Sequence, residues 1–194
     1  MGQRKITIKD AGTLNYNGSQ IAPLWAFREL GVQGDSVVFF QGEMKIPRDA
    51  LIDIKDLREH REAYPISSKR ALHLIVEHFD DASLRLGYHR QRILVTVAKE
   101  RVIDACNTHV KRKASDLYVG ERKLSVSVAT ASASSSKIHL GINIISEGVP
   151  EGVNAIGLEE LGVKDIAALA NDISKSYAEE IAEIEEDITK TRVF

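Results

Sequence analysis

Apolar and polar residues alternate most regularly in the later half of the chain. Leu124–Ala131 and Lys137–Ile145 place apolar side chains at every second position, which is the period of a β-strand. The segment that joins them, Ala131–Ser136, is small and polar, and it predicts a hairpin loop or a mobile flap. Leu117–Val119 predicts a further short strand. Three consecutive strands are therefore expected between residues 117 and 145.

Two other segments follow the helical period. Within residues 88–109, apolar positions recur at i, i+3 or i+4, and i+7, which favours one long helix. Ile93–Val97 taken alone would also fit a strand, so the length of the periodic pattern decides the prediction. Residues 163–189 repeat the spacing and predict the final helix. Its apolar face contains Ile166, Leu169, Ala170, Ile173, Tyr177, Ile181, Ile184 and Ile188.

The first fifty residues contain shorter signals. Residues 4–9 alternate like a short strand. Ser19 is a candidate N-cap for a helix that Gly31 would end. Ser36–Gln41 is a continuous β-branched and aromatic run, which is typical of a buried strand.

Residues 51–79 predict a strand followed by a helix. Leu51–Ile54 alternates after a turn and indicates the strand. Pro65 interrupts the chain, and Ser67 and Ser68 can then cap a helix. The apolar stripe of that helix would consist of Leu72, Ile75, Val76 and Phe79.

Together these elements predict an α+β fold. We expect a mixed, mainly antiparallel sheet with helices packed on one side. A length of 194 residues suits one domain, and neither an internal repeat nor a linker divides the chain. Residues 1–194 are therefore expected to form a single domain.

Composition and charge narrow the functional classes. A net charge of −2 gives no general reason to expect nucleic acid or an acidic membrane as a partner. The one cysteine, Cys106, excludes an intrachain disulfide framework and fits a reducing compartment. No apolar run approaches the ~20 residues that a membrane span needs, and the first residues do not resemble a signal peptide. We expect a soluble, cytoplasmic protein with no membrane partner.

The candidate chemistry lies between residues 111 and 145. A turn leads Lys123 onto a strand, with the carboxylate of Asp116 nearby. An ammonium group beside a bound acid can stabilise developing negative charge, so Lys123 is a candidate catalytic cation. Asp116 could orient it or bind Mg²⁺. The alternatives are a surface lysine at the start of a strand and a turn carboxylate that accepts hydrogen bonds from backbone amides.

Neighbouring residues add candidate ligand contacts. Arg112 could clamp a phosphate through its bidentate guanidinium, although a solvated basic run is the alternative. Gly141, inside a strand, permits close approach of a ligand or of another backbone. Asn143 could line the ligand or anchor a neighbouring loop. No metal site is predicted, because His73 and His78 lack the spacing of known zinc motifs.

The order of these motifs resembles the biotin and lipoate protein ligases, whose fold is related to class II aminoacyl-tRNA synthetases. In that superfamily a Lys-x-x-Asn-Asp element, a short turn, an Arg-Lys-leading strand and a Gly-Ile-Asn strand follow one another. Here Ser115-Asp116 stands in the place of Asn-Asp, Arg122-Lys123-Leu124 is similar to Arg-Lys-Leu, and Gly141-Ile142-Asn143-Ile144 is similar to Gly-Ile-Asn-Val. We expect a family of uncharacterised prokaryotic proteins within this superfamily.

The resemblance also implies further ligand-binding residues. Ser115 lies in the Asn-Asp position, and Ser125 replaces a glycine that usually follows the lysine. The Gly-Arg-Gly-Arg loop, which holds biotin and the adenylate in biotin ligases, has its nearest counterpart at Gln41 and Gly42.

The resemblance implies an acyl-transfer or carboxylate-activating enzyme that acts on a small carboxylic acid, with ATP and Mg²⁺ as candidate cofactors. The missing glycine-rich loops favour an alternative, a non-catalytic module that binds a small anion or a nucleotide-like metabolite. RNA binding is disfavoured, because two short basic clusters would neutralise only a few phosphates and no aromatic platform accompanies them. A homodimer, formed through a sheet edge or the early helix, is a further expectation.

Overall fold

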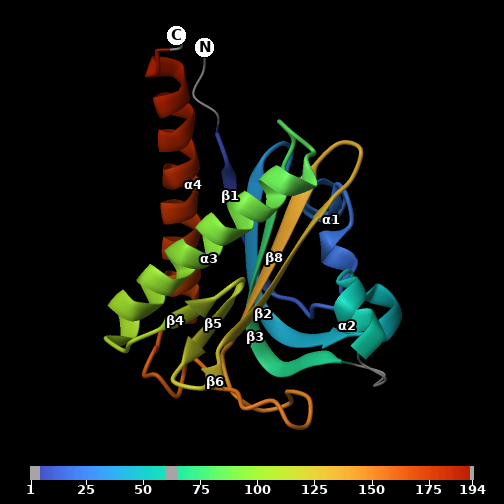
Figure 1. Cartoon of the computed structure of the whole chain (residues 1–194), viewed down its shortest axis with the longest axis vertical. Helices are drawn as coiled ribbons and strands as arrows, with labels where there is room; N and C mark the ends of the chain where they lie inside the picture. The colour runs from blue at the N-terminus through green and yellow to red at the C-terminus, as the bar shows by residue number, and fades with distance from the viewer. Residues whose placement is uncertain (1–4, 60–64, 193–194) are drawn as a thin grey trace.

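The main sheet has five strands. The computed structural model describes residues 5–59 and 65–192. The strand order is β1-β2-β3-β8-β7, and the pairings are antiparallel except for the parallel pairing of β1 with β2 (Figure 1). The predicted mixed, mainly antiparallel sheet is confirmed. Its strands are β1 (Thr7–Thr13), β2 (Ser36–Ile46), β3 (Ile66–His78), β7 (Ser125–Ala131) and β8 (Ser136–Asn143).

A small second sheet precedes β7 in the chain. It consists of β4 (Lys111–Lys113), β5 (Asp116–Val119) and β6 (Arg122–Lys123), in that order. The amide of Leu124, which follows β6, donates a hydrogen bond to the carbonyl oxygen of Leu117 at 2.8 Å. Since Leu124 also leads directly into β7, the small sheet is attached to the edge of the main one.

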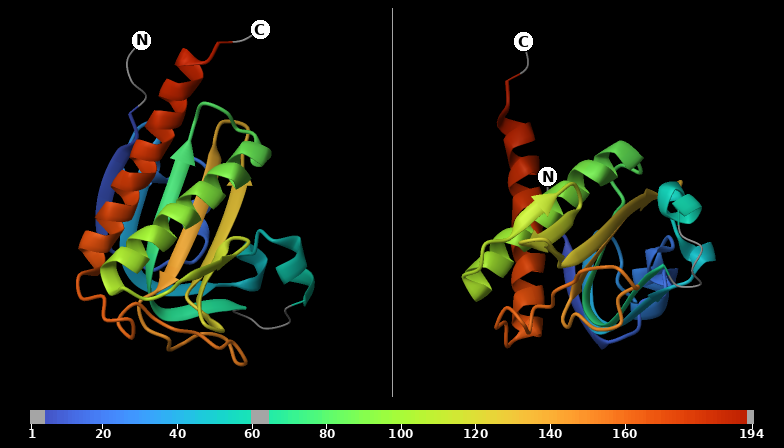
Figure 2. Two further views of the ribbon diagram at one scale, coloured as in Figure 1. Left: turned by 60° about the vertical axis from the view of Figure 1, so that its left-hand side comes forward. Right: turned by 60° about the horizontal axis from the view of Figure 1, so that its bottom comes forward.

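Two long helices cover one face of the main sheet (Figure 2). Helix α3 (Leu84–Cys106) packs on β7 and β8, and α4 (Ile166–Lys190) packs on β1, β2 and β3. The predicted helices at 88–109 and 163–189, and their position on one side of the sheet, are confirmed. The core between sheet and helices includes Leu74, Leu94, Ala98, Leu140, Ile142, Leu169, Ile173 and Tyr177.

The other face of the sheet packs against shorter elements. These are the 3-10 helices η1 (Ser19–Ile21) and η2 (Arg48–Ala50) and the helix α1 (Trp25–Leu30), whereas α2 (Ile54–Glu59) follows η2 in the chain. The predicted helix ending at Gly31 exists as α1, but Ser19 begins the separate η1 instead of capping it. A second apolar cluster lies on this face and includes Tyr16, Trp25, Val38, Phe40, Met44 and Ile75.

Two predictions from the first half are wrong. Residues 66–78 form β3, the central strand, and not a helix. Both faces of β3 are covered, so residues 71–78 are all buried and the apolar run is almost continuous. Such a run contains helical spacings by chance, so periodicity alone cannot identify it. Leu51–Ile54 is not a strand either, because Ile54 already begins α2.

The remaining strand predictions agree with the structure. Ser36–Gln41 is the first half of β2, and the three strands between residues 117 and 145 are β5, β7 and β8. The strand expected at residues 4–9 begins at Thr7, while Arg4 lies outside the described residues.

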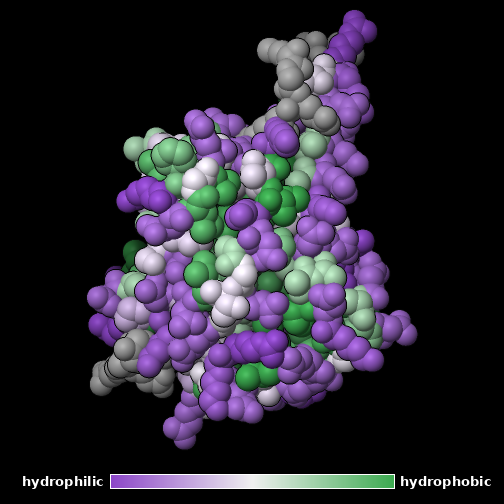
Figure 3. Space-filling view, turned by 180° about the vertical axis from the view of Figure 1, so that it is seen from behind, coloured by the Kyte–Doolittle hydropathy of each residue, from purple (hydrophilic) through white to green (hydrophobic). Residues whose placement is uncertain are grey.

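The surface is mixed in character. Viewed from behind, apolar side chains form small groups between hydrophilic ones (Figure 3). Within residues 5–59 and 65–192, no helix has the length and apolar character that a membrane crossing requires.

Candidate functional site

Lys123 and Asp116 form an ion pair in the small sheet. Nζ of Lys123 lies 2.7 Å from Oδ2 of Asp116, and the two side chains are 29% and 22% exposed. Lys123 is paired directly with Tyr118 across β5 and β6. Asp116 precedes Tyr118 by two residues and therefore lies on the same face of the ribbon. The strand register thus brings the ammonium and carboxylate groups together.

The backbone of Lys123 is held at three points. Its amide donates to the carbonyl oxygen of Asn154 at 2.8 Å, and its carbonyl accepts from the amide of Ile156 at 3.0 Å. The side-chain amide of Asn143 donates to the same carbonyl at 3.4 Å. The ammonium group is therefore presented from a fixed strand end.

The ion pair lines a cavity of about 380 Å³, which we call the Lys123 cavity. Small-molecule sites commonly have volumes of ~300–1,000 Å³, so the space suits a small organic ligand. Ser115, Ser125 and Asn143 belong to the same lining. The hydroxyl of Ser125 accepts a hydrogen bond from the amide of Leu117 at 2.9 Å, so this hydroxyl is engaged in the fold.

The other candidate residues lie outside the lining of this cavity. A Cβ atom on Gly42 would lie 2.0 Å from the carbonyl oxygen of Leu14, so this glycine permits close backbone approach. The side chain of Gln41 accepts from Arg70 at 3.5 Å. Arg112 is exposed and donates to the carbonyl of Ala114 at 2.7 Å.

Gly141 lies beneath an aromatic ring. A Cβ atom there would lie 3.2 Å from Cε1 of His139 and 3.4 Å from Sδ of Met44. The small residue therefore gives space to these two side chains, and both of them line the Lys123 cavity.

A buried aromatic stack under the cavity was not predicted from the sequence. The rings of Tyr16 and His139 stack with centroids 3.7 Å apart, and His73 stacks on Phe40 at 4.9 Å. Nδ1 of His73 lies 3.1 Å from Nε2 of His139. Tyr16 and His139 line the Lys123 cavity, so the stack forms part of its wall.

Both histidines of the stack are neutral at ordinary pH. Burial lowers the pKa of His73 to about 3, although the hydrogen bond with the carbonyl of Gly42 opposes the shift. Burial and the neighbouring His73 hold the pKa of His139 well below its usual range. A neutral imidazole has one donor and one acceptor nitrogen.

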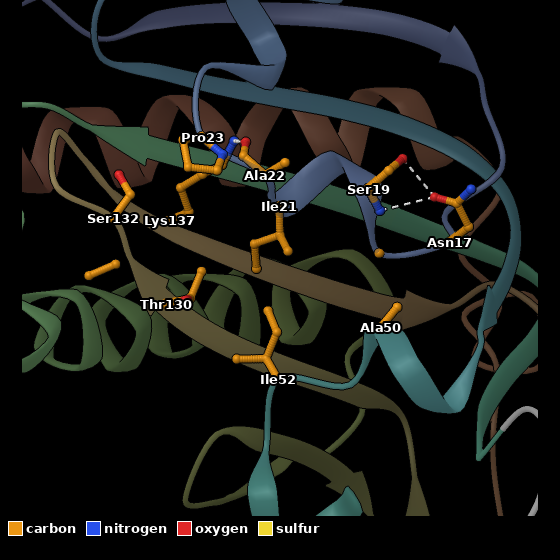
Figure 4. A pocket seen from close by; sticks show the side chains of 12 residues that line it. Asn17, Ser19, Ile21, Ala22, Pro23, Ala50, Ile52, Thr130, Ser132 and Lys137 are labelled. Atoms are coloured by element: carbon orange, nitrogen blue, oxygen red, sulfur yellow. Dashed lines mark hydrogen bonds between the residues drawn. The ribbon is translucent and has the colours of Figure 1, made fainter.

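A second cavity of about 400 Å³ adjoins the first and shares Ala50 and Ile52 with its lining. We call it the Lys137 cavity. Ile21 and Ile52 point toward each other across it, and Lys137 reaches toward Ala22 (Figure 4). Nζ of Lys137 donates to the carbonyl of Ala22 at 2.7 Å and to Oε2 of Glu77 at 3.2 Å. Burial lowers the pKa of this lysine, against the opposing effect of Glu77.

Asp35, His78 and Asp80 lie on the far side of the sheet from the cavities. One potential metal-ligating atom of each residue lies within 4.8 Å of those of the other two. These side chains already form hydrogen bonds or ion pairs with other residues of the same chain. Nε2 of His78 lies 2.8 Å from the hydroxyl of Tyr177, and Asp80 accepts two hydrogen bonds from Arg90, at 2.8 and 2.6 Å. These contacts connect β3 to α3 and α4, which is a structural role.

Solved ligase structures share this fold. A biotin protein ligase from Aquifex aeolicus, in complex with biotin and ATP, superposes with a TM-score of 0.64 at 16% identity, over 92% of this chain and 72% of that one. Protein Ta0514 from T. acidophilum, with bound lipoic acid, superposes with a TM-score of 0.57 at 10% identity, over 91% and 86% of the two chains. At these identities the likeness concerns the fold alone, and it confirms the predicted biotin/lipoate-ligase-like architecture.

More similar proteins have no described activity. The uncharacterized protein MJ0805 of Methanocaldococcus jannaschii is 46% identical over 187 residues, which cover 96% of this chain and 83% of that protein. A protein of unknown function from Pyrococcus horikoshi superposes with a TM-score of 0.91 at 35% identity, over 98% of this chain and 100% of that one. Residues 5–192 match the family described as Domain of unknown function (DUF366). The chain therefore belongs to the DUF366 family, which has the fold of the biotin and lipoate protein ligases.

Proposed function

We propose that this protein is a carboxylate-activating or acyl-transfer enzyme of the biotin/lipoate ligase type, and that it binds a small carboxylic acid in the Lys123 cavity. The observation that carries the proposal is the Lys123–Asp116 ion pair in the wall of a ligand-sized cavity. A lysine ammonium group has three N–H donors. Asp116 accepts from one of them, so two remain for the oxygen atoms of a ligand.

The proposed role of Lys123 is electrostatic. Its partly buried ammonium group would bind the acid and stabilise the negative charge that develops when the carboxylate is activated or its acyl group is transferred. Asp116 would hold the ammonium group in position, because the ion pair restricts its rotation. Lys123 lies at a strand end whose backbone is fixed by hydrogen bonds.

ATP and Mg²⁺ are the proposed co-substrate and cofactor. Asp53 and Asp56 line the same cavity, and carboxylate oxygens are ligands that Mg²⁺ prefers, whereas Asp116 is engaged by Lys123. When bound, the ion would neutralise part of the phosphate charge. The likeness to a ligase solved with biotin and ATP supports ATP as the co-substrate.

Calorimetric titration tests the proposal. Biotin, lipoate and octanoate would be titrated into the protein with and without ATP and Mg²⁺. We expect at least one acid to bind, and we expect Lys123→Gln to weaken that binding by a factor of about 10 or more, since a charged hydrogen bond is lost. Lys111→Gln, which removes an exposed lysine from β4, is the matched control and should leave the affinity unchanged. If none of the acids binds, the proposal fails.

A non-catalytic binding module is the second candidate. It is favoured by Gly42, which is packed against Leu14 within the sheet and does not belong to a glycine-rich loop that could hold phosphates. Release of pyrophosphate on addition of ATP and the bound acid would exclude this candidate. Binding without turnover would support it. A single functional domain, a cytoplasmic location and a homodimer stay predictions.

A further inference from the structure

Three neighbouring strands place a carboxylate, an ammonium group and a hydroxyl group in one row. Lys137 of β8 lies directly opposite Glu77 of β3 on one side and Thr130 of β7 on the other. Residues paired in this way have their side chains on the same face of a sheet, with Cβ atoms ~4.5–5.5 Å apart. Lys137 and Thr130 line the Lys137 cavity, and neither belongs to the lining of the Lys123 cavity (Figure 4).

The Lys137 cavity suits a small apolar molecule with one polar end. Its volume of about 400 Å³ lies in the range of small-molecule sites. Ile21 and Ile52 face each other across it and give it apolar walls. The polar side chains of Asn17, Ser19 and Ser132 also line it, but they form hydrogen bonds within their own turns. The amine and the hydroxyl group of the row are therefore the groups available to a ligand.

The amine of Lys137 keeps the capacity for a further contact. A lysine ammonium group has three N–H donors. Among the described residues, Nζ donates to the carbonyl of Ala22 at 2.7 Å and to Oε2 of Glu77 at 3.2 Å. Burial lowers the pKa of Lys137, Glu77 opposes this shift, and the positive charge of Arg28 adds to it. Proteins use lysines that are desolvated beside another cation as nucleophiles toward carbonyl groups.

We propose that Lys137 is an imine-forming lysine, which captures a small apolar aldehyde in the Lys137 cavity. Oε2 of Glu77 first accepts a proton from the ammonium group, and the neutral amine then attacks the carbonyl carbon. A C–N bond forms, and the carbonyl oxygen takes the proton back from Glu77. The hydroxyl group of Thr130 donates a hydrogen bond to that oxygen while negative charge develops on it.

Loss of water completes the reaction. Glu77 moves a second proton from the nitrogen to the new hydroxyl group, the C–O bond breaks, and a C=N bond forms. One aldehyde is consumed, one water is released, and no electrons are gained or lost. The product is a protonated imine, so a positive charge stays beside Glu77. The buried carboxylate therefore keeps its counter-charge, and the reaction does not remove the ion pair from the fold.

Reductive trapping on the native protein tests this inference. The protein would be incubated with pentanal and cyanoborohydride, which converts an imine into a stable secondary amine, and peptide mass mapping would locate the modified lysines. Lys69, whose side chain is 64% exposed in its pair with Glu147, is the internal control. We expect Lys137 to react about 10-fold faster than Lys69 or more, because each unit of lowered pKa raises the neutral fraction of an amine about tenfold. Equal or slower reaction of Lys137 would overturn the inference.

A substitution in the cavity gives a second test. Thr130→Val keeps the shape of the side chain but removes its hydroxyl group, and we expect trapping at Lys137 to slow by about 5- to 10-fold. Thr13→Val, an exposed substitution on β1, is the matched control and should leave the rate unchanged. The same rate in both variants would contradict a reaction inside the cavity.

The inference is independent of the proposed function. Lys123→Gln should weaken the binding of carboxylic acids and leave the trapping of pentanal at Lys137 unchanged. Trapping at Lys137 in a protein that binds none of the acids would support the inference while the proposed function fails. Loss of trapping in Lys123→Gln would overturn the assignment of the reaction to a separate cavity.

Discussion

Glu77 and Lys137 form an ion pair that is almost completely buried, with Oε2 of Glu77 3.2 Å from Nζ of Lys137 and both side chains 1% exposed. The pair also connects segments that are distant in the sequence. The other oxygen of Glu77, Oε1, accepts from the amide of Leu24 at 2.9 Å and from the hydroxyl of Ser135 at 2.7 Å. It therefore holds the segment before α1 and the tip of the β7–β8 hairpin against β3.

Loss of Lys137 alone should strongly destabilise the fold. In Lys137→Met the carboxylate of Glu77 stays buried without its counter-charge, and we expect the free energy of unfolding to fall by about 3–5 kcal/mol. The double variant Glu77→Gln/Lys137→Met should recover a large part of this loss, because no unpaired charge remains. Urea denaturation measures both. Lys69→Met, in the exposed pair with Glu147, should change little. Equal effects of the two lysine substitutions would contradict the prediction.

Stability should decrease at acidic pH because of the buried histidines. The pKa of His73 is about 3 in the folded protein and 6.5 when unperturbed, so the unfolded chain binds more protons throughout this window. The free energy of unfolding must then fall as the pH decreases from 6.5 toward 3, by ~1.4 kcal/mol per pH unit for each such histidine. The pKa of His139 is shifted in the same direction.

The double variant His73→Phe/His139→Phe should remove this contribution. Urea denaturation between pH 4.5 and 7.5 would show a shallower acid dependence in the variant than in the native protein. Parallel curves would mean that the two rings are not kept neutral by the fold. Carboxylates titrate in both proteins, so their contribution cancels in the difference.

Gly42→Ala should destabilise the protein. The added Cβ atom would overlap the carbonyl oxygen of Leu14, and the backbone would have to shift. Overpacking of this kind costs ~1–3 kcal/mol. Gly87→Ala on α3 is the control, because its Cβ atom would meet Ser136 at 3.4 Å, in ordinary contact, and alanine favours the helix. Thermal unfolding midpoints that fall only for Gly42→Ala would agree with this expectation.

Asp165→Ala should weaken the start of α4. The side chain of Asp165 accepts from the amide of Ala168 at 2.9 Å, and loss of such a cap costs about 1 kcal/mol. Asp172→Ala, an exposed substitution within the same helix, removes no cap and should be neutral or slightly stabilising. Unfolding of the two variants in urea compares them directly. A similar loss in both would argue against the cap.

Local patterns predicted the later half of the fold well. The alternation in β7 and β8 and the long stripes of α3 and α4 each lie within one element, so the sequence of that element contains the signal. The exception, β3, is covered on both sides, and its buried residues follow no period that separates strand from helix. Residues 71–78 form a strand because β3 is central in the sheet and is covered on both faces, and this burial cannot be read from the local sequence.

Contacts of the candidate site were also predictable only where they connect residues that are close in the sequence. Lys123 and Asp116 are close in the sequence and meet through one turn, so their pairing was predictable. His73 and His139 come from β3 and β8, and their contact depends on the pairing of those strands. A histidine inside an apolar strand was the available signal, but its partner could not be identified until β3 was placed in the sheet.

Even-numbered and odd-numbered residues of β8 face opposite sides of the sheet. Ile138, Leu140 and Ile142 belong to the core under the long helices, whereas Lys137, His139 and Asn143 line the two cavities. Substitutions at His139 and Asn143 can therefore change the wall of the Lys123 cavity while the hydrophobic layer stays unchanged, whereas Lys137 has to keep its ion pair with Glu77. A library restricted to positions 139 and 143 is therefore a starting point for altering the wall of this cavity without disturbing the core under the long helices.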